Sequence, residues 1–329
     1  MKRWWRVAVG GASHVRISLN LVSSQTPSRV DHLRIRAPQH HRRRCWRREC
    51  LCFERWRVRL WLRGRSALLR RAPTRRWCSL ERKENYAVVR LNRAPVNSLN
   101  TKLIQELDNA IKELEQDKKM RGMILASSTQ KVFSAGLDIM EMYQPHPSKL
   151  RTFWTSLQNL YLRFYTSRLA SVAAIEGHSP AGGCMLAMCC DWRVMTAGKP
   201  VIGLNETQLG IVAPTWFKET FVNTIGHREA EKMLGLGLQV DATKAKSIGL
   251  VDEAVPLEEV MPRAHAAMER WLAIPDNARV NTKLLMRKET ADRLRNTQEL
   301  DYEFFADFIQ TDKVQKTLGW YIESLKKKN

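Results

Sequence analysis

Three short segments of the chain combine residues that can stabilise and move charge. Phe133-Ser-Ala-Gly-Leu-Asp138 contains a glycine at which the backbone can turn and aim successive amides at one point. Ser179-Pro-Ala-Gly-Gly-Cys184 follows an apolar stretch and opens a predicted helix, whose first amides lack intrahelical partners. Gly203-Leu-Asn-Glu-Thr-Gln-Leu-Gly210 places Glu206 in a short polar interval. Two converging amides suit a reaction that builds charge on a carbonyl oxygen, and a carboxylate suits proton transfer.

Each of these segments also has an ordinary structural explanation. A glycine-rich junction between a strand and a helix is commonly just a tight turn, and a glutamate in a loop is usually solvated. Composition and spacing alone therefore predict an α/β protein with candidate anion or oxyanion sites.

Alternating strands and helices are predicted to position the three segments. The helix expected after Pro95, capped by Ser98 or Asn100, has an apolar stripe at three- and four-residue spacing: Leu103, Ile104, Leu107, Ile111 and Leu114. The other elements expected in this half are strands at 87–92, 122–126, 171–175 and 192–195, and helices at 148–166 and 184–190.

Beyond Gly210 the pattern is almost entirely helical. Helices are expected at about 215–225, 228–236, 242–248, 257–273, 278–295 and 299–326, interrupted mainly by the apolar run 251–255. The fold class is therefore α/β, with an α/β core at about 85–210 and a helical region at about 211–329.

The net charge of +22 is concentrated at the N-terminus. Residues 1–80 carry a charge of +18, whereas residues 81–329 carry only +4. An Arg-rich, acid-poor start predicts a targeting, disordered extension over 1–80, most typical at Ser66–Ser79. No nucleic-acid-binding motif accompanies the arginines, so no nucleic-acid partner is expected. No apolar run reaches the ~18–20 residues of a membrane span.

The three segments together, in this order and spacing, resemble the crotonase (enoyl-CoA hydratase/isomerase) family. The resemblance covers roughly residues 85–329 and includes Ala94-Pro-Val-Asn-Ser-Leu99 and Thr224-Ile-Gly-His-Arg228. It implies the crotonase spiral of ββα units, with a helical C-terminal region that forms a homotrimer. It also implies a fatty acyl-CoA substrate, a mitochondrial matrix location, and no metal or cofactor besides the CoA of the substrate.

The resemblance assigns roles to individual residues. Glu206 would be the catalytic base, and the backbone N–H groups of Leu137 and Gly182 would form the oxyanion hole. The residues implied to bind the substrate or its CoA are Ser134, Ala135, Gly136, Leu137, Asp138, Ala181 and Asn205. Two roles remain open for Pro214, Trp216 and Phe217: they could line the acyl pocket, or they could belong to the ordinary core.

A departure from the family pattern separates two activities. Hydratases of the family use two glutamates to add water, and here the first of those positions is Met185 while the second is Glu206. One base suffices to move a proton within one substrate. The chain is therefore expected to be an isomerase that converts 3-cis- or 3-trans-enoyl-CoA to 2-trans-enoyl-CoA in β-oxidation of unsaturated fatty acids.

Two alternatives stay open. One is a 2-enoyl-CoA hydratase that uses Glu206 with another acid. Glu176, which is close in sequence to Gly182, is a candidate for that acid. The other is an RNA-binding protein on a crotonase scaffold, driven by residues 1–80. His178 is expected to be a hydrogen-bonded loop histidine, and Asp191 is expected to mark a turn between a helix and a strand.

Overall fold

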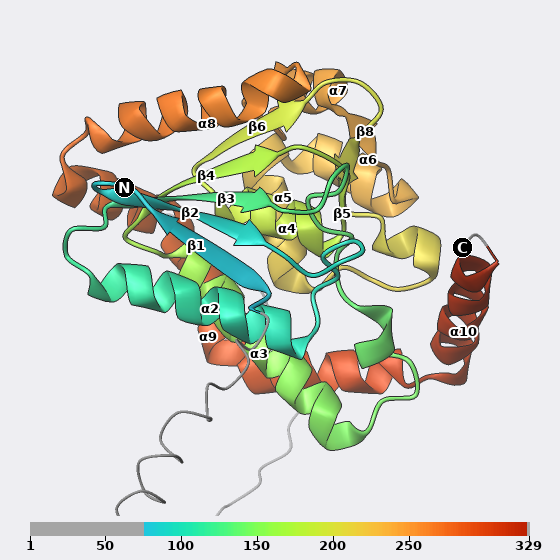
Figure 1. Ribbon diagram of the computed structural model, residues 1–329. Coiled ribbons are helices and arrows are strands. Elements are labelled where there is room, and N and C mark those ends of the chain that lie inside the picture. Colours follow the sequence, from blue (N-terminus) through green and yellow to red (C-terminus); the bar gives the residue numbers. More distant parts are fainter. Residues whose placement is uncertain (1–75, 328–329) are drawn as a thin grey trace, which may run out of the picture. The chain divides into compact units, whose positions relative to one another are not determined.

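The computed structural model describes residues 76–327. Within them the central element is a six-stranded sheet, whose strands lie between helices in Figure 1. Its strand order is β1-β2-β3-β4-β6-β9. Only β1 and β2 are antiparallel, and every other neighbouring pair in this sheet is parallel. The strands are β1 Cys78–Arg82, β2 Tyr86–Leu91, β3 Gly122–Ser127, β4 Ala170–Ile175, β6 Trp192–Thr196 and β9 Glu253–Val255.

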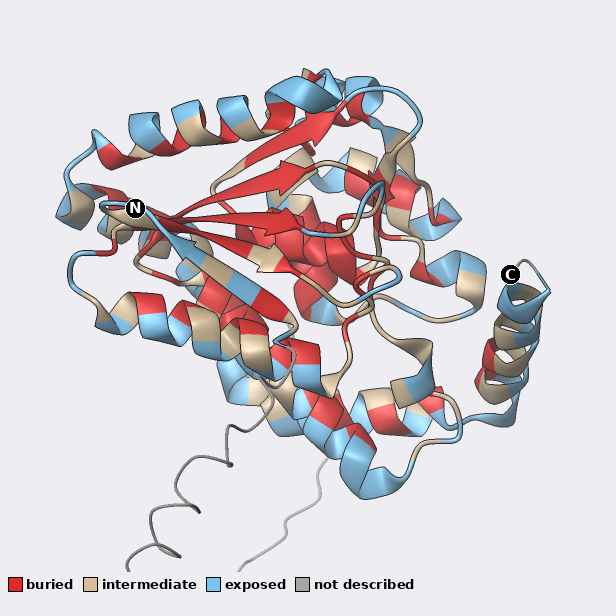
Figure 2. Ribbon diagram, in the orientation of Figure 1, coloured by how far each residue is buried: buried red, intermediate tan, exposed pale blue. Residues whose placement is uncertain are grey.

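Both faces of this sheet are covered by helices, so its central strands are buried throughout (Figure 2). Successive residues alternate between two cores, as the two-residue repeat of a strand requires. Val88 and Ile124 pack with α8 (Leu257–Leu272) on one face. Val89 and Leu125 belong to the larger core on the other face, which includes residues of α2 and α3.

The helix α2 (Thr101–Gln116) forms as its sequence predicts. Asn100 caps it, since the Asn100 side chain accepts a hydrogen bond from the backbone N–H of Leu103 at 3.0 Å. All five residues of the predicted apolar stripe are buried. The helix packs beside α3 (Pro147–Tyr165), which in turn packs against α9 (Asp276–Ile309).

A small second sheet contains the first residues of two of the three motif segments, Ser179 and Gly203. Its strands are β5 Ser179–Pro180, β7 Val201–Gly203 and β8 Val240–Asp241. The buried helix α4 (Gly182–Cys189) follows β5, and the 3-10 helix η2 (Glu206–Leu209) follows β7. A second 3-10 helix, η1 (Ile139–Glu141), follows the loop after β3. The pairing of β5 with β7 therefore sets η2 beside the start of α4.

The C-terminal helices correct one prediction. Helices α5 (Thr215–Ile225), α6 (His227–Leu236) and α7 (Ala242–Ser247) lie where the pattern places them. The expected break between 295 and 299 is instead a kink inside α9, and the chain breaks later, before α10 (Asp312–Lys326). Thr297 has non-helical φ and ψ of −127° and 16°, and its hydroxyl donates to the Arg293 carbonyl at 2.8 Å. Such side-chain bonding bends a helix without ending it.

The N-terminal prediction lies mostly outside the described residues, because the extension was assigned to 1–80 and the description begins at 76. Strand β1 begins at Cys78, three residues before the expected start of the catalytic domain. Of the helices that the structure describes, none is both long enough and apolar enough to cross a bilayer.

Candidate active site

The loop after β3 lies directly against the segment that joins β4 to α4. Val132 and His178 form a parallel bridge, in which the Phe133 N–H donates to the His178 carbonyl at 2.9 Å. The approach is so close that a Cβ on Gly177 would lie 2.0 Å from the carbonyl carbon of Lys131. Glycine is required there, because any side chain would push the two loops apart.

The backbone N–H of Leu137 points away from the parallel bridge that Leu137 forms with Leu99. Leu99 donates its N–H to the Gly136 carbonyl at 2.8 Å, and Asp138 donates to the Leu99 carbonyl at 3.1 Å. The carbonyl and N–H of a trans peptide point in opposite directions. Since the Gly136 carbonyl points to Leu99, the N–H of Leu137 points away from it. Among the described residues, this N–H donates no hydrogen bond.

A second amide, which also has no hydrogen-bond partner in the described part of the chain, lies beside it at the start of α4. Ala181 has φ 49° and ψ −122°, an uncommon conformation for a non-glycine residue, and it turns the chain into the helix. The Ala181 carbonyl accepts from the Met185 N–H, so the Gly182 N–H points out of the helix start. A Cβ on Gly182 would lie 3.3 Å from the Leu137 nitrogen, which places the two amides side by side.

Glu206 is a buried carboxylate at the first position of η2. It is 7% exposed, and its Oε2 atom has no hydrogen-bond partner among the described residues. Burial raises the pKa of Glu206 to about 7, because the charged form loses its hydration. The predicted apolar neighbours Ile202 and Leu204 are buried, and Leu209 is half-buried. A carboxyl group with a pKa near neutrality can both accept and return a proton.

Hydrogen bonds between β5 and β7 bring Glu206 to the two amides. Ala181 donates its N–H to the Gly203 carbonyl at 2.8 Å, one residue before the Gly182 amide and three before Glu206. The pKa of the Cys184 thiol is raised mainly by burial and also by the charge of Glu206. Because such an effect requires proximity, Glu206 lies near the first turn of α4. The buried Oδ1 atom of Asn205 also has no partner within the described residues.

Asn97 anchors the loop that carries the first amide, a role that was not predicted from the sequence. Its side chain donates to the Ser127 hydroxyl at 2.8 Å and to the Phe133 carbonyl at 3.0 Å. The Ser134 hydroxyl donates to the Asn97 carbonyl at 2.8 Å. Asn97 is fully buried and adopts a positive φ of 50°. The signal for it was its place in Ala94-Pro-Val-Asn-Ser-Leu99, one of the segments that carried the family resemblance.

The remaining predicted residues of this loop shape its backbone. Ser134 is buried and also accepts from the Gly136 N–H at 3.2 Å, and Ala135 donates its N–H to Val96 at 2.9 Å. Asp138 caps η1 through the Met140 N–H at 3.1 Å. Gly136 has φ 85°, and a Cβ there would lie 2.9 Å from the Cβ of Ala181.

Helix α10 borders the site from the far end of the chain. The Gln315 side chain donates to the Met142 carbonyl at 3.0 Å and accepts from the Gln144 N–H at 2.7 Å. A Cβ on Gly210, at the end of η2, would be 3.6 Å from Thr317 of the same helix. Helix α10 thus contacts the segments after η1 and η2. The sequence predicted these residues to be helical, as part of one helix at 299–326, but carried no signal for their position in the fold.

Three other candidate residues lie elsewhere or act structurally. Glu176 faces Arg90 at 4.0 Å, and burial raises the pKa of Glu176. His178 accepts a hydrogen bond at Nδ1 from the Val201 N–H at 3.3 Å, as a loop histidine was expected to do. Met185 is fully buried in the larger core.

Asp191 marks the turn before β6 as predicted, and it also holds a buried ion pair. Its carboxylate lies 2.6 Å from Lys283 Nζ and 3.1 Å from Arg287 on α9. Burial alone would raise the pKa of Asp191, yet the charges of Lys283 and Arg287 lower it.

Trp216 and Phe217 of α5 are both buried in the core. Within residues 76–327, no cluster of three or more His, Cys, Asp or Glu could hold a metal ion.

Comparison with known proteins assigns the chain to a family. A sequence model described as enoyl-CoA hydratase/isomerase matches residues 81–329. The chain belongs to the enoyl-CoA hydratase/isomerase family. This match confirms the family that the three motifs predicted, and the crotonase fold expected with it is confirmed as well.

Within that family, several proteins similar to this chain are named as enoyl-CoA isomerases. The protein named enoyl-CoA delta isomerase 1, mitochondrial, from Mus musculus is 50% identical over 243 residues, which cover 74% of this chain and 84% of that protein. The Homo sapiens protein of the same name is 48% identical over 242 residues, covering 73% of this chain and 80% of that protein. The crystal structure of human mitochondrial delta3-delta2-enoyl-CoA isomerase superposes with a TM-score of 0.76 at 45% identity, over 77% of this chain and 99% of that one.

Proposed function

We propose that this enoyl-CoA hydratase/isomerase family member is a mitochondrial Δ3,Δ2-enoyl-CoA isomerase that uses Glu206 as its single proton carrier. The observation that carries the proposal is the buried carboxyl of Glu206, which has a pKa of about 7. Among residues 76–327, one of its oxygens and the two nearby amides of Leu137 and Gly182 have no hydrogen-bond partner. The similarity to proteins named enoyl-CoA delta isomerase 1 supports the same activity.

The proposed reaction begins with removal of a proton from C2 of a 3-enoyl thioester. This proton is acidic because both the thioester and the adjacent double bond stabilise the resulting dienolate. The N–H groups of Leu137 and Gly182 would donate to the thioester oxygen as its charge grows, and loss of one such donor typically costs about 3–4 kcal/mol. Glu206, now protonated, returns the proton to C4 and leaves the 2-trans-enoyl-CoA. Asn205 would orient the thioester or the carboxyl group.

The pKa of Glu206 suits both halves of this transfer. A much stronger acid would be too weak a base at C2, and a much weaker acid would return the proton slowly. No metal or redox cofactor is needed, since CoA enters with the substrate. The loop residues Ser134, Ala135, Gly136 and Asp138, together with Ala181, would form the wall that binds the CoA thioester.

The hydratase alternative requires a second group that activates water. The position at which hydratases carry a second glutamate is occupied by the buried Met185, and the carboxylate of Glu176 lies 4.0 Å from Arg90. The absence of a glutamate at position 185 favours isomerisation over hydration.

The test of activity offers 3-hexenoyl-CoA and 2-hexenoyl-CoA to the protein in separate reactions. We expect the first to yield the conjugated 2-enoyl thioester, seen by ultraviolet absorbance. The second should give little 3-hydroxyacyl product by liquid chromatography. Rapid hydration of 2-hexenoyl-CoA without isomerisation of 3-hexenoyl-CoA would instead identify a hydratase.

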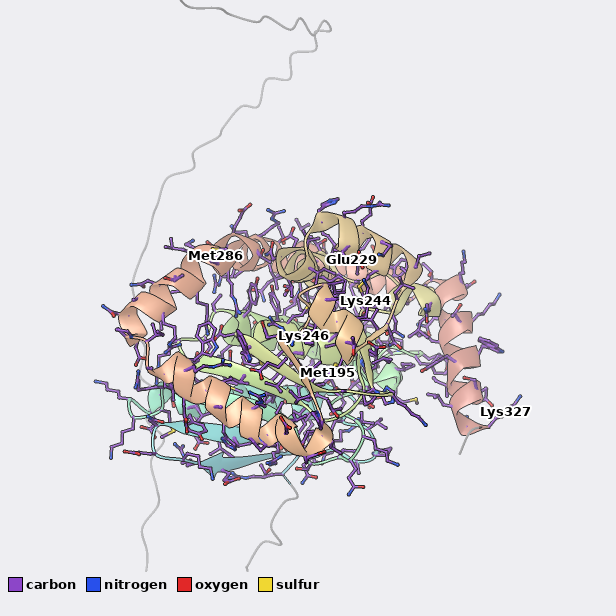
Figure 3. The ribbon with its side chains drawn as sticks, turned by 90° about the horizontal axis from the view of Figure 1, so that it is seen from above. Met195, Glu229, Lys244, Lys246, Met286 and Lys327 are labelled. Atoms are coloured by element: carbon purple, nitrogen blue, oxygen red, sulfur yellow. The ribbon has the colours of Figure 1, made fainter. Side chains whose placement is uncertain are left out.

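The proposed assembly is a homotrimer. Helix α9 exposes large apolar side chains, of which Met286, labelled in Figure 3, is 76% exposed and Phe304 is 68% exposed. Leu285 and Leu300 on the same helix are also exposed. Apolar groups repeated along one helix are typical of a surface that another subunit covers. Light scattering should give three times the mass of one chain, and a monomer would contradict this assembly.

The proposed location is the mitochondrial matrix, with the basic residues that precede β1 at Cys78 acting as the leader. The names of the mouse and human relatives support a mitochondrial protein. Mass spectrometry of the mature protein from mitochondria should show that most of the basic extension has been removed. If that extension stays attached and binds RNA with high affinity, the RNA-binding alternative gains support instead.

A further inference from the structure

The guanidinium of Arg93 joins two segments that together hold the Leu137 amide. Its Nη1 donates to the Ser98 carbonyl at 2.7 Å, and its Nη2 donates to Oδ2 of Asp138 at 2.6 Å. The ion pair is largely shielded, since the Arg93 and Asp138 side chains are 24% and 14% exposed. Arg93 thus holds two segments. One is the segment before α2, at Ser98, and the other is the loop Phe133–Asp138, here called the oxyanion loop, at Asp138 immediately after Leu137.

The hydrogen bond to Ser98 continues through two peptide groups to the same amide. The Ser98 carbonyl and the Leu99 N–H belong to one peptide, and that N–H donates to the Gly136 carbonyl at 2.8 Å. The Gly136 carbonyl in turn shares a peptide with the Leu137 N–H. A positive charge that pulls on the first carbonyl makes each following N–H a stronger donor, because hydrogen bonds in a chain polarise one another.

We propose that Arg93 is a positioning residue of the oxyanion hole, which orients and polarises the Leu137 N–H through the Ser98–Leu99 and Gly136–Leu137 peptides. The proposal rests on the proposed function, because it assigns the Leu137 amide to the thioester oxygen. Arg93 is not a catalytic residue, since two peptide groups separate it from the substrate.

The fork geometry of arginine is necessary for this role. One guanidinium reaches both Ser98 and Asp138, whereas a lysine ammonium is a single point charge that satisfies one of them well. Asp138 is held at the same time by Arg93 and by its backbone bond to Leu99 at 3.1 Å. Loss of Arg93 therefore frees Ser98 and Asp138, which flank the parallel backbone bridge between Leu99 and Leu137.

The experiment compares Arg93→Met and Arg93→Lys with the control Arg82→Met. Arg82 also forms two ion pairs, with Glu113 and Asp117, but it lies on β1 at the edge of the sheet. The turnover of 3-hexenoyl-CoA is measured for each variant. Binding of 2,4-hexadienoyl-CoA is followed by its absorption maximum, which moves to longer wavelength as its carbonyl oxygen accepts stronger hydrogen bonds.

For Arg93→Met we expect kcat to fall about tenfold, less than the 10²–10³-fold typical of losing an oxyanion donor outright. KM should change less than kcat, and the absorption shift of the bound thioester should shrink. Arg93→Lys should lie between this variant and the wild type in both readouts, and Arg82→Met should match the wild type. A purely structural role would lower the melting temperature yet leave kcat and the absorption shift intact, and that result would overturn the proposal.

Glu206→Gln separates this proposal from the proposed function. The variant should lose turnover but keep the full absorption shift, since its amides are untouched. An active wild type with an inactive Glu206→Gln, combined with a fully active Arg93→Met, would refute only the role of Arg93. A wild type that neither isomerises 3-hexenoyl-CoA nor shifts the dienoyl absorption would refute the function itself. If Arg93→Met does not fold, Arg93→Lys still decides, because a normal kcat and shift there contradict the need for both hydrogen bonds.

Discussion

Ala181 donates its backbone N–H to the carbonyl oxygen of Gly203 at 2.8 Å. This hydrogen bond joins the turn that presents the Gly182 amide to the segment that ends in Glu206. The two groups are far apart in sequence, and the short parallel pairing of β5 with β7 brings them together. The proposed base and the proposed oxyanion hole thus share one small sheet, so a displacement of either strand would separate them.

Replacing Glu206 with glutamine keeps the size of the side chain but removes the base. We expect kcat for 3-hexenoyl-CoA to fall by at least about 10²-fold, as is typical for loss of a general base. KM should change little, because the amides still bind the thioester. The measurement is steady-state kinetics by ultraviolet absorbance. Full activity of the variant would exclude Glu206 as the proton carrier.

The pH dependence of the reaction should follow the raised pKa of Glu206. The free enzyme must hold this carboxyl in its charged form to remove the C2 proton, and its pKa is about 7. We therefore expect kcat/KM to fall as the pH drops below about 7 and to level off above it. An inflection near pH 4.5, the ordinary value for glutamate, would show that burial does not control this group.

The same raised pKa should make the protein less stable at alkaline pH. Between pH 4.5 and about 7 the unfolded chain loses the Glu206 proton before the folded protein does, so stability falls as the pH rises. The shift corresponds to about 3 kcal/mol of unfolding free energy above that window. Glu206→Gln avoids this cost, and urea denaturation should show it more stable than the wild type at pH 8 but not at pH 4. An equal difference at both pH values would contradict the linkage.

Gly136 and Gly198 form a matched pair for testing the oxyanion loop. Both have positive φ, 85° and 98°, so alanine costs backbone strain at each. A Cβ at Gly136 would lie 2.9 Å from the Ala181 Cβ and 3.0 Å from the Gly182 nitrogen, whereas a Cβ at Gly198 would have no atom of the described residues within 4 Å. We expect Gly136→Ala to lower kcat by about 10²-fold, as for loss of one oxyanion donor, and Gly198→Ala to retain wild-type kcat. Similar kcat values for both variants would argue against the loop geometry.

The buried pair of Asp191 and Lys283 should be essential for stability. Their side chains are only 3% and 4% exposed, and Lys283 also donates to the carbonyls of Ser167 and Leu169. Lys283→Met would leave Asp191 buried with reduced pairing, and such losses typically cost about 3–5 kcal/mol. Denaturant titration should show this loss, while Arg228→Met in the exposed pair with Glu231 should leave the midpoint unchanged. A stable Lys283→Met protein would show that Arg287 alone compensates Asp191.

Local patterns were sufficient to predict most helices, because an amphipathic helix repeats its apolar residues within one segment. Helix α5 has the predicted bounds 215–225, and the Asn100 cap of α2 was one of the two expected. The misplaced break near Thr297 has a local cause as well. A threonine that bonds to the preceding turn disturbs the pattern as a true end would, although the helix continues.

The sequence by itself determined the family, the α/β class and the identity of the chemical groups, because glycines and a carboxylate at fixed spacing are written in the chain. Only the tertiary structure decided that Glu206 is buried and that one of its oxygens bonds to none of the residues 76–327, since a loop glutamate has no local signal of burial. The ion pair of Asp191 with Lys283 and the contact of Gln315 with Met142 also join distant segments. Packing between elements creates these relationships, and no periodicity within one element can encode them.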